Sequence, residues 1–174
     1  MNGALLPKDH GKPVRLLVPG WYGCCNIKWV NRIAWVGEDA PATSQMKEFA
    51  SRTHQTAAHA LAKQYKPATM DQTAMPIRVE KWQLPNGANA YKVIGVMWGG
   101  YALTDALQAQ FGKEPHVSVN VCPKQATNAT WTLWTHVWQP TAAGTYSITL
   151  RIDDPAIPTR RLDLKWYRRV VKIT

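Results

Sequence analysis

The sequence lacks any apolar run close to the ~20 residues that a helix needs to cross a bilayer. The N-terminal stretch from Met1 to His10 also lacks the hydrophobic segment of a signal peptide. We therefore expect a soluble chain that makes no membrane contact and carries no export signal of its own.

Cysteine is scarce, with only Cys24, Cys25 and Cys122. An odd count without a repeated spacing gives no disulfide framework. Adjacent cysteines rarely bond to each other, because the bridge strains the peptide between them. No Cys-x-x-Cys or His-x-x-x-His pair is present, so the sequence offers no ligand set for zinc. We interpret the three cysteines as small buried thiols.

Acidic residues are few, with 11 Asp and Glu against 21 Lys and Arg, and the formal net charge is +10. Such an excess of positive charge favours anionic partners, such as nucleic acid, anionic lipid or a phosphate-bearing ligand. The densest cations lie near the C-terminus, where one interpretation is an edge strand that cations protect from aggregation. The alternative is base stacking by the 165–169 segment (KWYRR). No zinc finger, RRM signature or basic amphipathic helix supports it, so we expect no nucleic-acid partner. The cluster consists of Arg160, Arg161, Lys165, Arg168, Arg169 and Lys172.

The second half of the sequence predicts a mainly β fold. Short segments rich in β-branched and aromatic residues alternate with turn signals such as Pro85-Asn86-Gly87, a pattern typical of an antiparallel sandwich of immunoglobulin-like type. Residues 102–111 interrupt the pattern and predict a short helical insertion. The predicted strands are 77–82, 91–98, 116–121, 130–138, 145–152 and 166–173.

The first half predicts a mixed segment. Residues 14–18 (VRLLV) favour a buried strand that ends at Pro19-Gly20, and residues 27–36 favour one or two further strands. Residues 38–64 are either partly helical, with Ser44 as a cap, or an irregular connector. Residues 66–76 are interpreted as a linker.

One set of side chains could carry binding chemistry. Arg15 offers a planar fork of donors that matches a phosphate, and Lys28 offers a point charge. His10 and the amides of the glycine-containing turn at 19–23 add further donors. These residues suit a phosphate-bearing ligand at a sheet edge, although isolated cations on strands are more often simply solvated.

The order of these residues resembles a known family. The string from His10 to Gly20, H-G-x-P-x-R-x-x-x-P-G, is followed by Gly23 and by Lys28-Trp29. It is similar to the segment by which sulfite oxidases, plant-type nitrate reductases and bacterial sulfite dehydrogenases close their molybdopterin site. Three later stretches resemble the immunoglobulin-like dimerisation domain of that family: 93–100 (VIGVMWGG), 131–134 (WTLW) and 144–154 (GTYSITLRIDD).

The resemblance implies two domains and a set of cofactor contacts. Residues 1–70 would be a small α+β remnant of a molybdopterin-binding domain with its connector, and residues 71–174 the immunoglobulin-like dimerisation domain. His10 and Arg15 match family residues that contact the pterin and its phosphate. Asn26, Ile27 and Lys28 match a segment that also contacts the molybdenum cofactor. None of the five is implied to be catalytic or to ligate a metal.

The chain departs from the family pattern in two places. In the family the cysteine that ligates molybdenum lies well upstream of the matched histidine, and this chain contains no such stretch. The family arginine that meets the oxyanion substrate follows a W-S-G-G motif, whereas here Trp98-Gly99-Gly100 is followed by Tyr101, with Lys113 as an open substitute. Bacterial relatives are often periplasmic, and the compartment stays open.

These departures lead to an expectation for the whole chain. We expect the truncated C-terminal portion or subunit of a molybdopterin-dependent oxidoreductase, catalytically incomplete as this chain alone. Its expected partner is a second copy of the chain in a homodimer, or a separate N-terminal molybdopterin-domain chain. The alternative is a non-catalytic β-sandwich module for dimerisation or protein binding.

Overall fold

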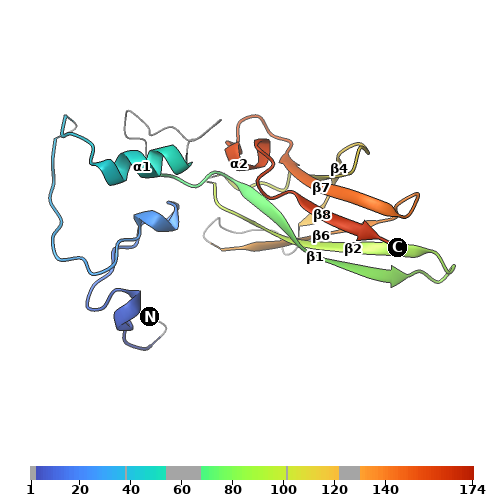
Figure 1. The fold of residues 1–174 in the computed structure, drawn as a ribbon, viewed down its shortest axis with the longest axis horizontal. Helices are drawn as coiled ribbons and strands as arrows, with labels where there is room; N and C mark the ends of the chain where they lie inside the picture. The colour runs from blue at the N-terminus through green and yellow to red at the C-terminus, as the bar shows by residue number, and fades with distance from the viewer. Residues whose placement is uncertain (1–2, 38, 54–67, 101, 122–129) are drawn as a thin grey trace. The chain divides into compact units, whose positions relative to one another are not determined.

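The computed structural model describes residues 3–37, 39–53, 68–100, 102–121 and 130–174 (Figure 1). The chain divides into two compact units, Met1–Met70 and Asp71–Thr174. None of the described helices is long and apolar enough to span a bilayer. Each unit is described by itself below.

The second unit is built from two four-stranded antiparallel sheets. The first sheet has the strand order β1-β2-β6-β5, and the second has the order β4-β3-β7-β8. A short helix, α2 (Arg160–Asp163), precedes the last strand. The strands are β1 (Thr73–Gln83), β2 (Asn89–Trp98), β3 (Leu107–Phe111), β4 (Val117–Ser118), β5 (Asn120–Val121), β6 (Thr132–Trp138), β7 (Gly144–Ile152) and β8 (Arg169–Ile173).

One hydrophobic cluster joins the two sheets. Val93 and Met97 from β2 and Trp134 from β6 pack in the same cluster as Leu107 from β3 and Ile148 from β7. Side chains from both inner faces thus fill a common core, as in a β-sandwich. The predicted mainly β, antiparallel sandwich is confirmed.

Gly95 makes room for the largest side chain in this core. It lies opposite Trp134 in the β2–β6 register, and a Cβ at this position would collide with the indole ring. Trp134 is fully buried, and its Nε1 donates to the carbonyl of Val96 at 3.2 Å. A buried indole needs such a partner for its N–H. The close approach of ring to backbone explains why a glycine stands within a central strand.

Residues 102–111 do not form the predicted helical insertion. The strand β3 occupies 107–111, where Leu107, Ala109 and Phe111 are buried and the two glutamines between them are partly exposed. This alternation has the period of two of a strand. Pairing with β7 along the whole of β3 selects the strand over the local helical tendency.

Other boundaries also differ from the predictions. The segment 116–121 forms two short strands, β4 and β5, which belong to different sheets. The linker ends earlier than predicted, because β1 already begins at Thr73. The turn at Pro85-Asn86-Gly87 is present, and the amide of Gly87 donates to the carbonyl of Leu84 at 2.8 Å.

The described residues of the first unit form the helices η1 (Lys8–His10), η2 (Gly23–Cys25) and α1 (Ser44–Thr53). The cap of α1 is Thr43 rather than the predicted Ser44, because the Thr43 hydroxyl accepts the amide of Met46 at 3.2 Å. The part of the predicted helical stretch from 54 to 64 lies outside the described residues. An isolated bridge joins Trp21 and Thr69.

The predicted strands at 14–18 and 27–36 are not formed within the described residues. The two segments share hydrogen bonds from the Leu16 amide to the Ile27 carbonyl at 2.9 Å and from the Val30 amide to the Val14 carbonyl at 3.0 Å. A strand needs a continuous ladder as well as β-forming residues. The expected burial of 14–18 is also wrong, since Val14 is 54% exposed and Leu17 is 60% exposed.

Candidate functional site

The short helix η1 is the centre of a cluster in the first unit. Its backbone carbonyls accept hydrogen bonds from two side chains that are distant in sequence. Lys28 Nζ donates to the Asp9 carbonyl at 2.7 Å, and Trp29 Nε1 donates to the Lys8 carbonyl at 3.0 Å. Arg15 Nη1 lies 3.4 Å from the His10 carbonyl. The structure therefore brings His10, Arg15 and Lys28 around one turn.

Gly11 allows the close approach of Lys28. Its φ is +109°, a conformation that side-chain-bearing residues rarely adopt. A Cβ on Gly11 would lie 3.0 Å from Cβ of Lys28 and 3.1 Å from its Cα. Glycine at this position is thus required both by the backbone conformation and by the space that Lys28 occupies.

Asn26 and Ile27 form hydrogen bonds that stabilise the turn before Lys28. The Asn26 side-chain oxygen accepts the amide of Val18 at 2.7 Å. The backbone of Ile27 donates to the carbonyl of Cys25 at 3.2 Å and accepts from the amide of Leu16. Both predicted residues lie in the same cluster as the cations, and their contact with a cofactor stays a prediction.

Arg15 has a buried donor that could bind a ligand. Its Nε is buried, yet it has no hydrogen-bond partner among the described residues. A buried donor without a partner costs about 1–3 kcal/mol. The Lys28 ammonium has three N–H groups, of which one is used on the Asp9 carbonyl. The donor set fits a phosphate, and the five predicted residues are compatible with an anionic cofactor.

Two residues of this cluster were not predicted as site residues. Trp29 has a positive φ of 52°, which is uncommon for a residue other than glycine, and its indole binds the Lys8 carbonyl. Gly11 is the second. Both stand in the string that carried the resemblance, but only the three-dimensional contact shows that they place Lys28.

Lys113, which the sequence left open as a substitute for the family's substrate arginine, does not lie beside Gly99 and Gly100. Gly99 and Gly100 follow the end of β2, whereas Phe111, two residues before Lys113, stacks on Trp138 at 4.7 Å. Trp138 pairs with Tyr91 at the start of β2. Lys113 and the glycine pair therefore lie at opposite ends of the sandwich.

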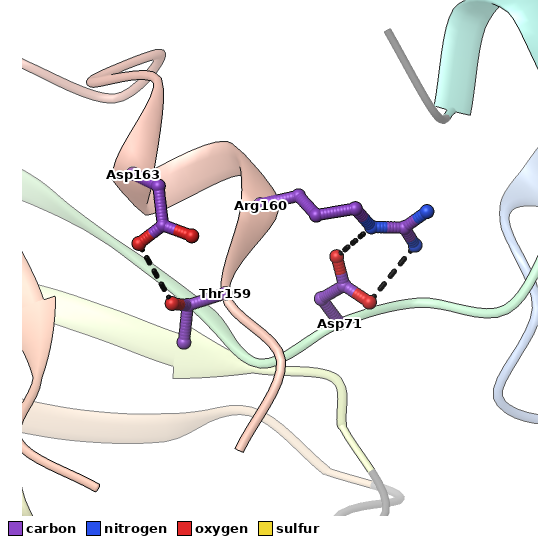
Figure 2. A network of polar contacts seen from close by, with 4 residues as sticks. All are labelled: Asp71, Thr159, Arg160 and Asp163. Atoms are coloured by element: carbon purple, nitrogen blue, oxygen red, sulfur yellow. Dashed lines mark hydrogen bonds and ion pairs between the residues drawn. The ribbon is translucent and has the colours of Figure 1, made fainter. Parts of the chain in front are cut away.

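Two arginines of α2 lie at the glycine-pair end, and both are engaged. Arg160 forms a bidentate pair with Asp71, in which Nη2 lies 2.9 Å from Oδ1 (Figure 2). The Arg161 guanidinium lies 4.3 Å from the ring centre of Trp166, a cation–π contact. Gln72 links this end to the glycine pair, because its Nε2 donates to the Trp98 carbonyl at 3.1 Å.

Comparison with known proteins finds similarity over the part of the chain that contains the η1 cluster. Residues 1–44 match the model of the oxidoreductase molybdopterin-binding domain. The chain is 41% identical over 49 residues to sulfite oxidase of Gallus gallus, which covers 28% of this chain and 11% of that protein. It is 58% identical over 33 residues to nitrate reductase [NADPH] of Fusarium oxysporum, which covers 19% of this chain and 4% of that protein.

The N-terminal part of the chain is similar to the sulfite oxidase family of molybdopterin-binding oxidoreductases. This finding confirms the predicted family resemblance. Mitochondrial sulfite oxidase of Homo sapiens is likewise 41% identical over 49 residues. The chain spans about a tenth of the length of these sulfite oxidases, 11% and 9%. The match to a molybdopterin-binding domain implies a molybdenum cofactor for residues 1–44, which include η1.

Proposed function

We propose that this chain supplies the phosphate- and pterin-binding part of a molybdenum-cofactor-dependent oxidoreductase of the sulfite oxidase type. The observation that carries the proposal is the η1 cluster, in which the buried, unpaired Nε of Arg15 and the ammonium of Lys28 gather beside His10. Arg15 would bind the cofactor phosphate as a fork, and Lys28 would neutralise its charge. The bound molybdenum would supply the redox chemistry, while these residues hold and orient the cofactor.

We propose that the η1 cluster forms only part of the cofactor site. The described residues contain no group of three or more His, Cys, Asp or Glu that could hold a metal ion. The exposed apolar side chains of the first unit point to a covering partner, because large exposed apolar patches mark interaction surfaces. We propose an N-terminal molybdopterin-domain chain as that partner. These side chains include Leu5, Val14, Leu17, Trp29, Ile33, Trp35 and Val36.

Coexpression tests this proposal. The chain is produced alone and together with an N-terminal molybdopterin-domain chain of the family, each time purified through a tag on this chain. We expect molybdenum and pterin only in the coexpressed preparation, and oxidation of sulfite or reduction of nitrate only there. A coexpressed complex without molybdenum or pterin would contradict the proposal.

For the second unit we propose an immunoglobulin-like dimerisation domain. The orders β1-β2-β6-β5 and β4-β3-β7-β8 agree with the immunoglobulin orders A-B-E-D and C′-C-F-G. The Tyr146 hydroxyl at the start of β7 donates to the Ala142 carbonyl at 2.8 Å, like the tyrosine corner of strand F in such domains.

The outer face of β6 supports dimerisation. Leu133 is 49% exposed and Val137 is 53% exposed, while Trp134 and Trp138 of the same strand face the core. Light scattering coupled to size-exclusion chromatography should show a dimer that becomes a monomer in Leu133→Lys/Val137→Lys. Val170→Lys, an exposed position on β8, is the matched control and should stay dimeric. A monomeric wild-type chain removes dimerisation and leaves protein binding as the role of this module.

A further inference from the structure

Cys24 and Cys25 form a pair of adjacent thiols that the proposed cofactor contacts do not use. Both are free cysteines, with Cys24 exposed and Cys25 partly exposed. Their sulfur atoms lie 3.9 Å apart, so the two side chains point to the same side of the chain. Two thiols at this separation can act on one ligand together.

The turn that presents the thiols is fixed on both sides. The Cys25 amide donates to the Tyr22 carbonyl at 2.9 Å, and the Asn26 amide donates to the Gly23 carbonyl at 3.1 Å. The Asn26 side chain accepts the Val18 amide directly after the pair. The hydrogen bonds of η2 and its flanks therefore preorganise the two sulfur atoms rather than leaving them on a free loop.

The separation favours a shared metal ion over a disulfide. A disulfide needs its sulfur atoms at about 2.05 Å, and closing the gap between neighbouring residues strains the peptide. With metal–sulfur bonds of about 2.3 Å, the observed 3.9 Å corresponds to a sulfur–metal–sulfur angle of about 116°. That angle lies between the tetrahedral and trigonal values, so the sulfur atoms already stand at a chelating distance.

The number of ligands decides which kind of metal fits. Zinc in a structural site takes four protein ligands, and the described residues offer no group of three or more His, Cys, Asp or Glu that could hold a metal. Thiolates select soft ions, among which Cu(I) accepts a low coordination number. A linear two-coordinate ion would need the sulfur atoms about 4.6 Å apart, so the observed separation fits a bent site. We propose that Cys24 and Cys25 bind one Cu(I) ion through their two thiolates, with a third position open to a small external ligand.

Binding must displace the thiol protons. Each Cu(I) would replace one proton on each sulfur, so two thiols and one cation give a bis-thiolate complex and two released protons. The apparent affinity should therefore increase as the pH rises from 6 toward 9, because less work is needed to remove the protons.

The test is a titration of the reduced full chain with Cu(I) without oxygen, in competition with a chromogenic Cu(I) chelator. We expect one Cu(I) per chain, and a loss of affinity of about tenfold or more in Cys24→Ser and in Cys25→Ser. Cys122→Ser is the matched control and should bind like the wild type. Far-UV circular dichroism checks that each variant is folded.

The outcomes separate this site from the proposed cofactor function. Wild-type affinity in either Cys24→Ser or Cys25→Ser would overturn the proposal, and so would a loss of binding in Cys122→Ser or an affinity that does not rise with pH. The experiment uses the chain without pterin or partner. Failure of cofactor binding in the coexpression test therefore leaves its result unchanged.

Discussion

Gly11 controls the position of Lys28 in the η1 cluster. Gly11→Ala places a Cβ about 3.0 Å from the Lys28 Cβ and forces a positive φ on a residue with a side chain. We expect the variant to retain less pterin in the coexpressed complex, because Lys28 is displaced from the Asp9 carbonyl. Pterin fluorescence of the denatured complex measures the loss.

Gly3→Ala is the matched control for this prediction. Gly3 also has a positive φ, +76°, but a Cβ there would meet nothing within 4 Å. It should retain pterin like the wild type. Equal losses in the two variants would show that backbone strain, rather than the contact with Lys28, is responsible.

The Asp71–Arg160 pair fixes α2 to the segment that leads into β1 (Figure 2). Asp71 is only 8% exposed, and Arg160 is partly exposed. Asp71→Asn removes the negative charge from the buried end of this bidentate pair, so the free energy of unfolding should fall by about 2 kcal/mol. Urea unfolding followed by circular dichroism measures the change.

Asp163→Asn provides the comparison on the same helix. Asp163 is exposed and accepts a hydrogen bond from the Thr159 hydroxyl at 2.9 Å, which asparagine can also accept (Figure 2). We expect a change in the free energy of unfolding below about 0.5 kcal/mol. A loss as large as that of Asp71→Asn would mean that the buried Asp71–Arg160 pair stabilises the fold no more than the exposed hydrogen bond does.

At the scale of elements, His136 on β6 makes the stability of the β-sandwich depend on pH. Its ring stacks on Phe111 at 5.3 Å, and burial lowers its pKa below the usual value, opposed by a hydrogen bond with the Ser118 backbone. The unfolded chain therefore binds more protons than the folded chain near pH 6.5. Stability is present above pH 6.5 and should fall as the pH drops through 6.5 toward 5.5.

His136→Phe should weaken this pH dependence while keeping a ring against Phe111. Midpoints of urea unfolding at pH 7.5, 6.5 and 5.5 provide the measurement. His116, whose pKa is lowered by partial burial and by Arg151, contributes in the same direction and should leave a residual slope. An unchanged slope in His136→Phe would show that His136 does not couple folding to pH.

Most strands of the second unit could be predicted from sequence, but β3 could not. Segments such as 91–98 carry β-branched and aromatic residues, which indicate a strand without tertiary context. The Leu107–Phe111 segment (LQAQF) contains residues that suit a helix locally, and only its pairing with β7 makes it a strand. The reverse holds at 14–18, where β-forming residues lack a complete ladder.

At the scale of the whole molecule, the sequence predicted the family resemblance, but it did not predict which apolar side chains of the first unit are exposed. The string around His10 and Arg15 is enough to indicate a resemblance to the molybdopterin-binding family, because it combines particular side chains and glycines at fixed spacings. In the first unit, apolar side chains such as Trp35 and Ile33 are exposed. Local sequence cannot show this, because the exposure of a side chain depends on its tertiary contacts. For the same reason the contacts of Gly11 and Trp29 with η1 required the structure.

We propose that Arg15 anchors the phosphate of the cofactor. The most direct measurement is the pterin content per chain of the coexpressed complex in the wild type, Arg15→Gln and the control Arg32→Gln, an exposed arginine outside the η1 cluster. The loss of a charge-assisted, forked contact should lower pterin retention roughly tenfold in Arg15→Gln and leave Arg32→Gln unchanged. Wild-type pterin content in Arg15→Gln would contradict the account.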